Sequence, residues 1–298
     1  MTETLSNEVF ADELRPAVER YYHRHLENAR PWAVFEQIDW GQGTSYKDQP
    51  WTAEDYPLPD GVRSAIYVNL LTEDNAPYYT NLLMSRTPDD HPLHAWNGQW
   101  TMEEGQHSDA IRDWAHISRA IDPALLEAGR RVQMANGEVP QPRTMTDMLA
   151  YVPFQEAATQ VAHRRTAKQL PEEDKTGKKV LALIAGDEGR HYAFYRDVAK
   201  AGFEIDPSRM MQAVAEQVIT FAMPGTGIPD FKAHEKKIAR SKIYDLTRFK
   251  DEVVDPTLEA WDIEHLGGLD SSAEQAREKL MKHMERIGNA ATYFARKT

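Results

Sequence analysis

The sequence lacks cysteine altogether, and this absence excludes several kinds of site. None of its 298 residues is a cysteine, so disulfide frameworks, zinc–thiolate centres and cysteine nucleophiles are ruled out. A chain of this length suffices for one large or two modest hydrophobic cores. A metal site in this protein must therefore be built from carboxylate and imidazole groups.

Long hydrophobic runs and excess positive charge are missing too. The apolar stretch at residues 180–185 is far shorter than the roughly 20 residues of a membrane span. No basic segment followed by an apolar one opens the sequence, so we expect no signal peptide and a cytoplasmic location. With 35 Lys and Arg against 47 Asp and Glu, the net charge is −12. This charge argues against a general nucleic-acid-binding surface, and an acidic partner would need a local basic patch.

Helical periodicity dominates the sequence, and the alternation of apolar and polar residues typical of β-strands is nearly absent. The patterns predict an all-α fold with an irregular connection over residues 32–61, which is rich in proline and glycine. No linker divides the chain, so we expect a single helical domain over residues 1–298, with core helices at about 62–201 and a looser part at about 225–298. Helices are expected at residues 7–26, 62–84, 95–120, 124–136, 145–169, 173–201, 207–221, 246–262 and 272–295.

Acidic side chains stand on the apolar faces of four of these helices. Glu73 lies among Ile66, Leu70 and other apolar residues. A buried carboxylate is costly unless a proton, a cation or a metal ion compensates it. Pro77, four residues further on, should kink the helix at Glu73, because its ring disturbs the carbonyl group one turn back.

Spacing links the four acids. Glu104 and His107 are three residues apart on one helix face, and Glu188 and His191 repeat this pattern. A single glutamate comes first each time, 31 residues before Glu104 and 32 before Glu188. Di-iron carboxylate bundles use such a set, and its oxygen and imidazole donors suit iron or manganese better than tetrahedral zinc. The predicted metal ligands are Glu73, Glu104, His107, Glu156, Glu188 and His191.

Around these residues the chain resembles the soluble acyl-acyl-carrier-protein desaturases, a ferritin-like di-iron family, and most of all their actinobacterial branch. The resemblance rests on residues 72–77, 100–104, 154–159 and 187–198. It implies an all-α, ferritin-like four-helix di-iron bundle core with additional flanking helices. By the same resemblance Glu73 and Glu156 are terminal carboxylates, Glu104 and Glu188 bridge two iron ions, and His107 and His191 supply nitrogen.

The resemblance also assigns roles near the metal. Thr159 matches a threonine beside the oxygen-binding side of the irons, where it either relays protons or bonds back to its own helix. Glu103 and Asp187 fit the orientation of the histidine on the opposite helix. Trp32 aligns with a tryptophan linked through an aspartate to the metal, a possible path for electrons, although core packing explains it equally simply.

The chain departs from the family in two places. Gly105 and Ser108 flank the first histidine where the family usually has asparagine and glycine, and Gly189 lies inside the second motif. Glycine inside a helix costs up to about 1 kcal/mol relative to alanine. These departures do not affect the ligand assignment, but they leave open how the two helices pack at these positions.

As the resemblance implies, the activity is O2-dependent introduction of a cis double bond into a fatty acyl chain on acyl carrier protein. It implies a homodimer fed by reduced ferredoxin; no flavin or nicotinamide motif is present in the sequence. A bent apolar tunnel would hold the chain. Its candidate lining residues, which suit ordinary core packing as well, are Met102, Leu149, Val152, Phe154 and Thr159.

An acidic carrier protein needs a positive docking surface. Residues 232–250 hold seven basic and two acidic side chains, a local charge of +5. A second cluster contains His23, Arg24, His25 and Arg30. A solvated helix face explains the first cluster at least as well as docking does, and the sequence does not choose between the two clusters.

Other functions stay open. A di-iron oxygenase could act on a free fatty acid, an amine or an amino acid, and a ferritin-like homologue could bind iron without turnover or serve an active paralogue. Glu156, where a further histidine could stand, favours the desaturase pattern. The helices beyond the four metal-bearing ones disfavour a storage protein.

Overall fold

A computed structural model describes residues 5–137, 139–222, 225 and 227–295, and within these ranges the chain is helical with no β-strand. The predicted all-α class is confirmed. The elements in chain order are α1 (Asn7–Asn28), α2 (Val34–Gln37), η1 (Trp40–Gln42), α3 (Asp60–Glu73), α4 (Ala76–Ser85), α5 (Leu93–Ile117), α6 (Pro123–Asn136), α7 (Met145–Gln169), α8 (Lys175–Ile205), α9 (Pro207–Ile219), α10 (Phe231–Arg240), α11 (Leu246–Arg248), η2 (Phe249–Val254), α12 (Asp255–Ala260) and α13 (Ser271–Ala295).

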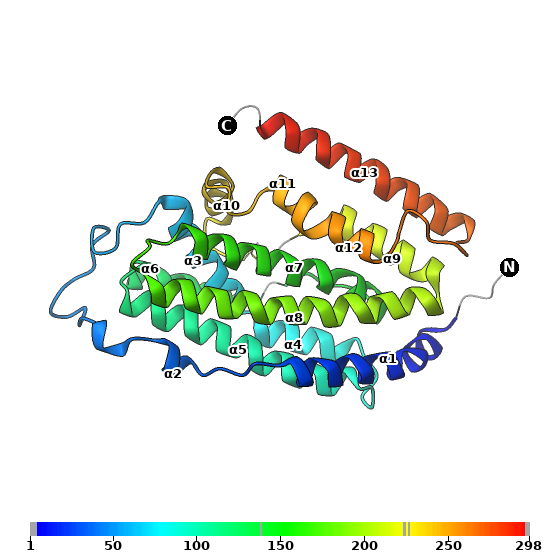
Figure 1. Ribbon diagram of the computed structural model, residues 1–298, viewed down its shortest axis with the longest axis horizontal. Coiled ribbons are helices and arrows are strands. Elements are labelled where there is room, and N and C mark those ends of the chain that lie inside the picture. Colours follow the sequence, from blue (N-terminus) through cyan, green and yellow to red (C-terminus); the bar gives the residue numbers. More distant parts are fainter. Residues whose placement is uncertain (1–4, 138, 223–224, 226, 296–298) are drawn as a thin grey trace.

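Four long helices, α3, α5, α7 and α8, form the central bundle (Figure 1). Helix α7 packs along α8, α5 contacts both α3 and α8, and α3 closes the bundle against α7. The other helices cover this core: α1 lies on α8, α4 on α5, α10 on α3, and α9 on α7 with α13 outside it. The flanking helices therefore shield the interior of the four-helix core from solvent.

Local sequence signals set several helix starts. The Ser6 hydroxyl accepts a hydrogen bond from the Val9 amide at the start of α1. Thr144 and Asp147 form a reciprocal capping box at the start of α7. Gly137 ends α6 with the left-handed backbone (φ 60°) that glycine tolerates best. These caps explain why the predicted and observed bounds of α1 and α7 agree closely.

The predicted helix at residues 62–84 is interrupted. Helix α3 ends at Glu73, and α4 begins at Ala76 with Pro77 in its first turn. Pro77 has no backbone N–H to donate, and its ring cannot sit beside the carbonyl group of residue 73 in a continuous helix. The kink expected at Glu73 is thus a full break, which places this glutamate at a helix end.

The C-terminal part differs from prediction more strongly. The helix expected at residues 246–262 is observed without a gap from Leu246 to Ala260, but its middle part, η2, is a π-helix between α11 and α12. Pro256 follows directly and lacks the donor for a regular α-helical bond. Helix α10 was not among the predicted helices, since Phe231 and Ile238 are only half-buried among charged residues.

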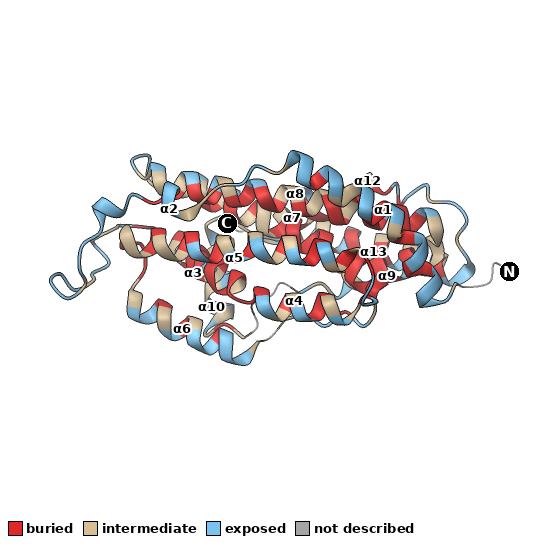
Figure 2. Ribbon diagram, turned by 90° about the horizontal axis from the view of Figure 1, so that it is seen from below, coloured by how far each residue is buried: buried red, intermediate tan, exposed pale blue. Residues whose placement is uncertain are grey.

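Two hydrophobic clusters fill the molecule, and a polar layer lies between them. Along α5, Trp96 and Trp100 belong to one cluster and Ile111 and Trp114 to the other. Along α8 the clusters likewise occupy opposite ends, and buried residues line the inner faces of the bundle (Figure 2). The polar layer between them is the candidate site. In the described part of the chain, every helix is too short or too polar to cross a bilayer.

Candidate metal centre

The structure brings all six predicted ligands together in the polar layer. Glu73 comes from the end of α3 and Glu156 from α7, while α5 and α8 each contribute one glutamate and one histidine. Each side chain is buried: the glutamates are at most 6% exposed, and both histidines are 0% exposed. Four buried carboxylates this close together require positive charge.

These side chains form two overlapping groups. The first contains Glu73, Glu104, His107 and Glu188, and the second contains Glu104, Glu156, Glu188 and His191. Within each group one donor atom per residue lies within 4.8 Å of the others. Glu104 and Glu188 belong to both groups. The geometry therefore offers two adjacent metal positions with two shared carboxylates, as the resemblance implies.

Both histidines turn the same ring atom toward the carboxylates. His107 Nδ1 lies 3.5 Å from Glu188 Oε1, and His191 Nδ1 lies 3.0 Å from Glu104 Oε1. Neither Nδ1 atom has a hydrogen bond of acceptable geometry within the described residues, nor do Glu104 Oε1 and Glu188 Oε2. Buried polar atoms that converge without hydrogen bonds are unusual. This arrangement fits a pair of metal ions that would accept these lone pairs.

The electrostatics agree with that interpretation. Burial and the neighbouring carboxylates of Glu188 and Glu73 raise the pKa of Glu104 to about 7. Burial acts to lower the pKa of His107, but contacts with Glu104 and Glu188 outweigh it and raise that pKa well above its usual value. In the absence of a metal ion the cluster must gather protons, and bound cations would replace them.

Outside the cluster, Asp187 holds the first histidine. Asp187 Oδ2 lies 3.1 Å from His107 Nε2 and accepts a hydrogen bond of 2.8 Å from Trp32 Nε1. Arg190 pairs with the other carboxylate oxygen of Asp187. Trp32 is therefore connected through Asp187 to His107, in the arrangement that the resemblance implies.

Glu103 holds the second histidine in the same way. Its Oε2 atom lies 2.6 Å from His191 Nε2, and its Oε1 atom lies 3.1 Å from His25 Nε2. His25 is only 5% exposed, so it cannot belong to a basic docking cluster. That part of the second predicted docking cluster was wrong, because His25 faces the interior of the bundle.

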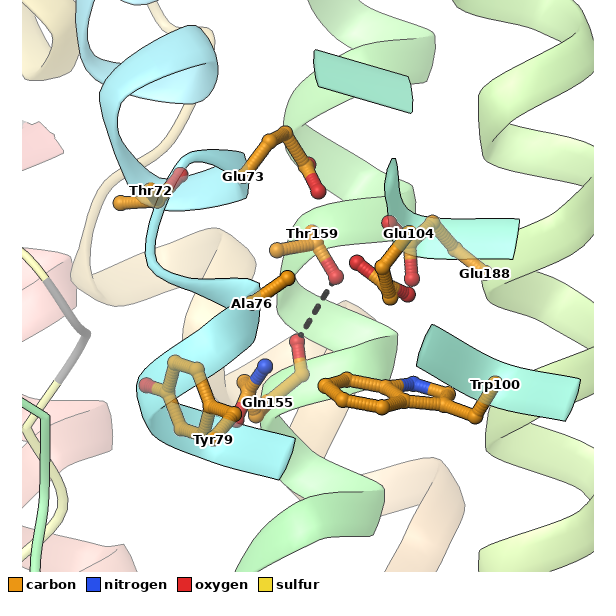
Figure 3. A pocket seen from close by; sticks show the side chains of 9 residues that line it. All are labelled: Thr72, Glu73, Ala76, Tyr79, Trp100, Glu104, Gln155, Thr159 and Glu188. Atoms are coloured by element: carbon orange, nitrogen blue, oxygen red, sulfur yellow. Dashed lines mark hydrogen bonds between the residues drawn. The ribbon is translucent and has the colours of Figure 1, made fainter. Parts of the chain in front are cut away.

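Thr159 lies beside a small cavity next to the carboxylates (Figure 3). Its hydroxyl donates to the Gln155 carbonyl at 3.1 Å, the bond back to its own helix that was one of its two expected roles. Tyr79 and Trp100 also line the cavity, along with Gln155. The cavity has a volume of about 10 Å³, close to the space of one water molecule.

The expected apolar tunnel is therefore not open at this cavity. Leu149, Val152 and Phe154 are fully buried and belong to the first hydrophobic cluster, the core-packing role that was their alternative. Met102 was a wrong choice for the lining, because its side chain is 56% exposed on the outer side of α5. An acyl chain needs several hundred Å³, so side chains around Tyr79 and Gln155 would have to move to admit one.

Three further contacts fix the end of α3. His163 Nε2 lies 2.9 Å from Glu73 Oε1, so this histidine supports a predicted ligand and stands outside both groups. Asp74 accepts hydrogen bonds from Ser108 Oγ at 2.6 Å and from Arg130 Nε at 2.6 Å. These bonds tie the break after α3 to α5 and α6, directly beside Glu73 and the first histidine.

The departures from the family pattern leave the helices intact. Helix α5 continues through Gly105, where an added Cβ would meet nothing within 4 Å. Helix α8 continues through Gly189, and a Cβ there would approach only the flexible end of Gln160. Neither glycine is required by the packing, and Ser108 replaces the family's glycine with a hydrogen-bond donor to Asp74.

Sequence reasoning found Glu103, Asp187 and Trp32 but missed the supporting residues His25 and Arg130. His25 contacts Glu103 across 78 positions of sequence, and Arg130 contacts Asp74 across 56. No local spacing rule connects such pairs. The only available signal was the presence of a histidine on the apolar face of α1.

A four-helix core with a buried carboxylate and imidazole cluster defines the class of ferritin-like helical bundles. Comparison with known proteins agrees. The X-ray structure of an acyl-ACP desaturase, DesA2 of Mycobacterium tuberculosis, matches this fold with a TM-score of 0.69 at 23% identity, covering 90% of this chain and 99% of that one. The predicted ferritin-like architecture with flanking helices is therefore confirmed.

Sequence comparisons identify the family. The family model described as fatty acid desaturase matches residues 6–298. The acyl-acyl-carrier-protein desaturase DesA1 of M. tuberculosis is 34% identical over 274 residues, which cover 88% of this chain and 80% of that protein. A palmitoyl-acyl-carrier-protein 4-desaturase of Ophrys sphegodes is 27% identical over 77% of this chain and 62% of its own length. The chain belongs to the fatty acid desaturase family.

Proposed function

We propose that this protein is an O2-dependent acyl-acyl-carrier-protein desaturase that introduces a cis double bond into a fatty acyl chain through a carboxylate-bridged di-iron centre. One observation carries the proposal: two buried groups of metal-binding type overlap in Glu104 and Glu188. Membership of the desaturase family supports the reaction class. The names of the relatives from Mycobacterium tuberculosis and Ophrys sphegodes support a carrier-bound acyl chain as substrate.

In this proposal Glu104 and Glu188, which belong to both groups, would be shared by the two ions. Glu73 and His107 complete one position, and Glu156 and His191 complete the other. When bound, two iron ions with O2 supply the oxidising power to remove hydrogen from an unactivated methylene group, which side-chain acids and bases cannot do.

The chain's own residues hold the ligand side chains in place and exclude water from the site. Trp100 Nε1 donates a hydrogen bond of 3.0 Å to Glu156 Oε1 and so fixes this carboxylate. Asp187 and Glu103 each hold the Nε2–H of a histidine, which leaves Nδ1 as the lone pair that faces the cluster. The Thr159 hydroxyl lies at the cavity, where rotation away from the Gln155 carbonyl would let it carry a proton.

Electron delivery and assembly are parts of the same proposal. The hydrogen-bonded series from Trp32 through Asp187 to His107 supports electron entry from a ferredoxin-type donor at the half-exposed Trp32. A homodimer is proposed from the family resemblance, and light scattering would check it. A single domain is supported by Tyr244, which packs against both hydrophobic clusters.

The test combines metal content with product analysis. Protein loaded with Fe²⁺ under anaerobic conditions should hold two ions, and with reduced ferredoxin and O2 it should desaturate an acyl chain on acyl carrier protein. The same chain offered as a free acid should react far more slowly. Glu104→Ala should abolish turnover, whereas Glu172→Ala, at a side chain 93% exposed, should not. Turnover of the free acid alone would instead favour an oxygenase.

A further inference from the structure

His25 is a buried histidine that belongs to neither group of candidate metal ligands. It lies near the end of α1, where the edge of its ring meets Trp96 at a centroid distance of 4.8 Å. Its Nε2 atom faces Glu103 Oε1 at 3.1 Å. Its ring is 6.0 Å from that of His191, so it belongs to the surroundings of the candidate metal centre without entering it.

The hydrogen bonds decide which nitrogen of His25 carries the proton. Its Nδ1 atom is buried and has no hydrogen-bond partner in the described part of the chain. A proton placed there would be unsatisfied in the interior, which costs free energy. The proton therefore belongs on Nε2, where it is donated to the Glu103 carboxylate.

Glu103 in turn joins three donors. It accepts from His25 and Gln99 at Oε1 and from His191 at Oε2. Because the Glu103 carboxylate accepts from His191 at Oε2, the proton of His191 lies on Nε2 and Nδ1 is free to bind a cation.

Gln99 alone would hold Glu103 less firmly. It lies on the same helix one turn away and is half exposed, so it cannot fix α5 relative to another element. His25 comes from α1 and is buried on all sides by the bundle. His25 donates a hydrogen bond to Glu103, as Trp32 does to Asp187. Helix α1 and the segment after it therefore support both histidines of the cluster.

We propose that His25 is a positioning residue for the metal position built from Glu104, Glu156, Glu188 and His191. By donating to Glu103 it keeps the imidazole of His191 in the tautomer and orientation that bind metal. The inference rests on the proposed function, because it requires that the cluster bind two ions.

Metal binding of purified variants tests this role without any measurement of turnover. Equilibrium binding of Fe²⁺ under anaerobic conditions would be measured for the wild type, His25→Leu and His25→Gln. Leucine removes the donor, whereas the glutamine amide can occupy the place of Nε2 and donate to Glu103. His23→Leu is the matched control, because His23 lies on the same helix and is exposed.

We expect two ions per chain in the wild type, in His23→Leu and in His25→Gln. In His25→Leu one ion should bind normally and the second at least tenfold more weakly, the effect typical of removing a supporting partner. Wild-type affinity for both ions in His25→Leu would overturn the inference while leaving the proposed function intact. A wild-type protein that binds fewer than two ions would overturn both.

A second variant covers the case in which His25→Leu does not fold. In His25→Asn the side chain is polar but ends short of Glu103, so the second ion should be weakened as in the leucine variant. Circular dichroism would establish that the helices are retained. Full binding of both ions by folded His25→Asn would equally contradict the positioning role.

Discussion

At the scale of single residues, the shared carboxylates distinguish two kinds of ligand. Glu104 and Glu188 lie in both groups of the candidate centre, whereas Glu73 lies in only one. We therefore expect Glu104→Ala to lose both iron ions and Glu73→Ala to lose one while the second binds more weakly. Metal analysis after anaerobic loading and desalting checks this. Equal losses in the two variants would contradict the bridging assignment.

The ion pair between Arg130 and Asp74 supports the end of α3. Its side chains are only 14% and 4% exposed. Removing one partner leaves a buried charge uncompensated, so Arg130→Met should lower the free energy of unfolding by about 3 kcal/mol. Urea unfolding measures the change. Arg131→Met, at an exposed position of the same helix, should stay within about 0.5 kcal/mol of the wild type.

Whether a residue's role could be predicted from the sequence depends on how close its partners lie along the chain. The pairs Glu104–His107 and Glu188–His191 lie one turn apart on single helices, so their spacing is visible in the sequence. The supporting residue His25 reaches its partner only through the packing of α1 on the bundle. Its role depends on tertiary contacts, which no local pattern encodes.

At the scale of elements, His91 joins two helices at the edge of the bundle. Its Nε2 atom donates to the Ala11 carbonyl of α1 at 3.0 Å, and its Nδ1 atom accepts from the Leu93 amide at the start of α5 at 3.2 Å. Only the neutral imidazole makes both bonds. Burial lowers the pKa of His91, and Arg15 contributes to the decrease.

This histidine should make stability depend on pH. Because its pKa is lower in the folded state, its contribution is present above the unfolded pKa of about 6.5 and is lost as the pH falls. We expect His91→Asn to be less stable than the wild type by about 1 kcal/mol at pH 7 and by less at pH 5. Urea unfolding at both pH values checks this, and a difference that does not change with pH would contradict it.

The elements could be predicted where one strong signal was present. Capping residues and apolar periodicity located α1, α5 and α7 to within a few residues. Prediction was weaker where a proline acts in a context set by packing: Pro77 produced a complete break, and Pro256 follows a π-helical turn. Helix α10 was missed, and the structure shows it on α3, with Phe231 and Ile238 against the second hydrophobic cluster and His234 against the ring of Tyr67.

At the scale of the whole molecule, the polar layer explains why one chain contains two hydrophobic clusters. The two clusters occupy opposite ends of α5 and α8, with the predicted ligands of these helices between them. Bound ions would join the two halves through four helices. The order of apolar and acidic segments along these helices therefore corresponds to the layers of the fold.

Charge is a property of the whole molecule that would affect docking of the proposed acidic carrier protein. Within a chain of net charge −12, the first predicted docking region is positive, and its exposed part is α10, where Lys236 and Arg240 lie one turn apart. Arg248 pairs with Asp245 and Lys250 with Asp255, so these two bases offer less to a partner. An acidic carrier protein would be steered to α10 by long-range attraction.

Charge reversal on α10 tests this steering. Lys236→Glu with Arg240→Glu should raise the KM for an acyl-carrier-protein substrate at least about threefold at low salt and leave kcat nearly unchanged, since charges at the edge of an interface act mainly on association. The effect should shrink at high salt, where such charges are screened. Lys279→Glu with Lys282→Glu, at exposed positions of α13, changes the net charge by the same amount. A similar KM increase in this control would show that total charge, and not the position of α10, governs the encounter with the carrier.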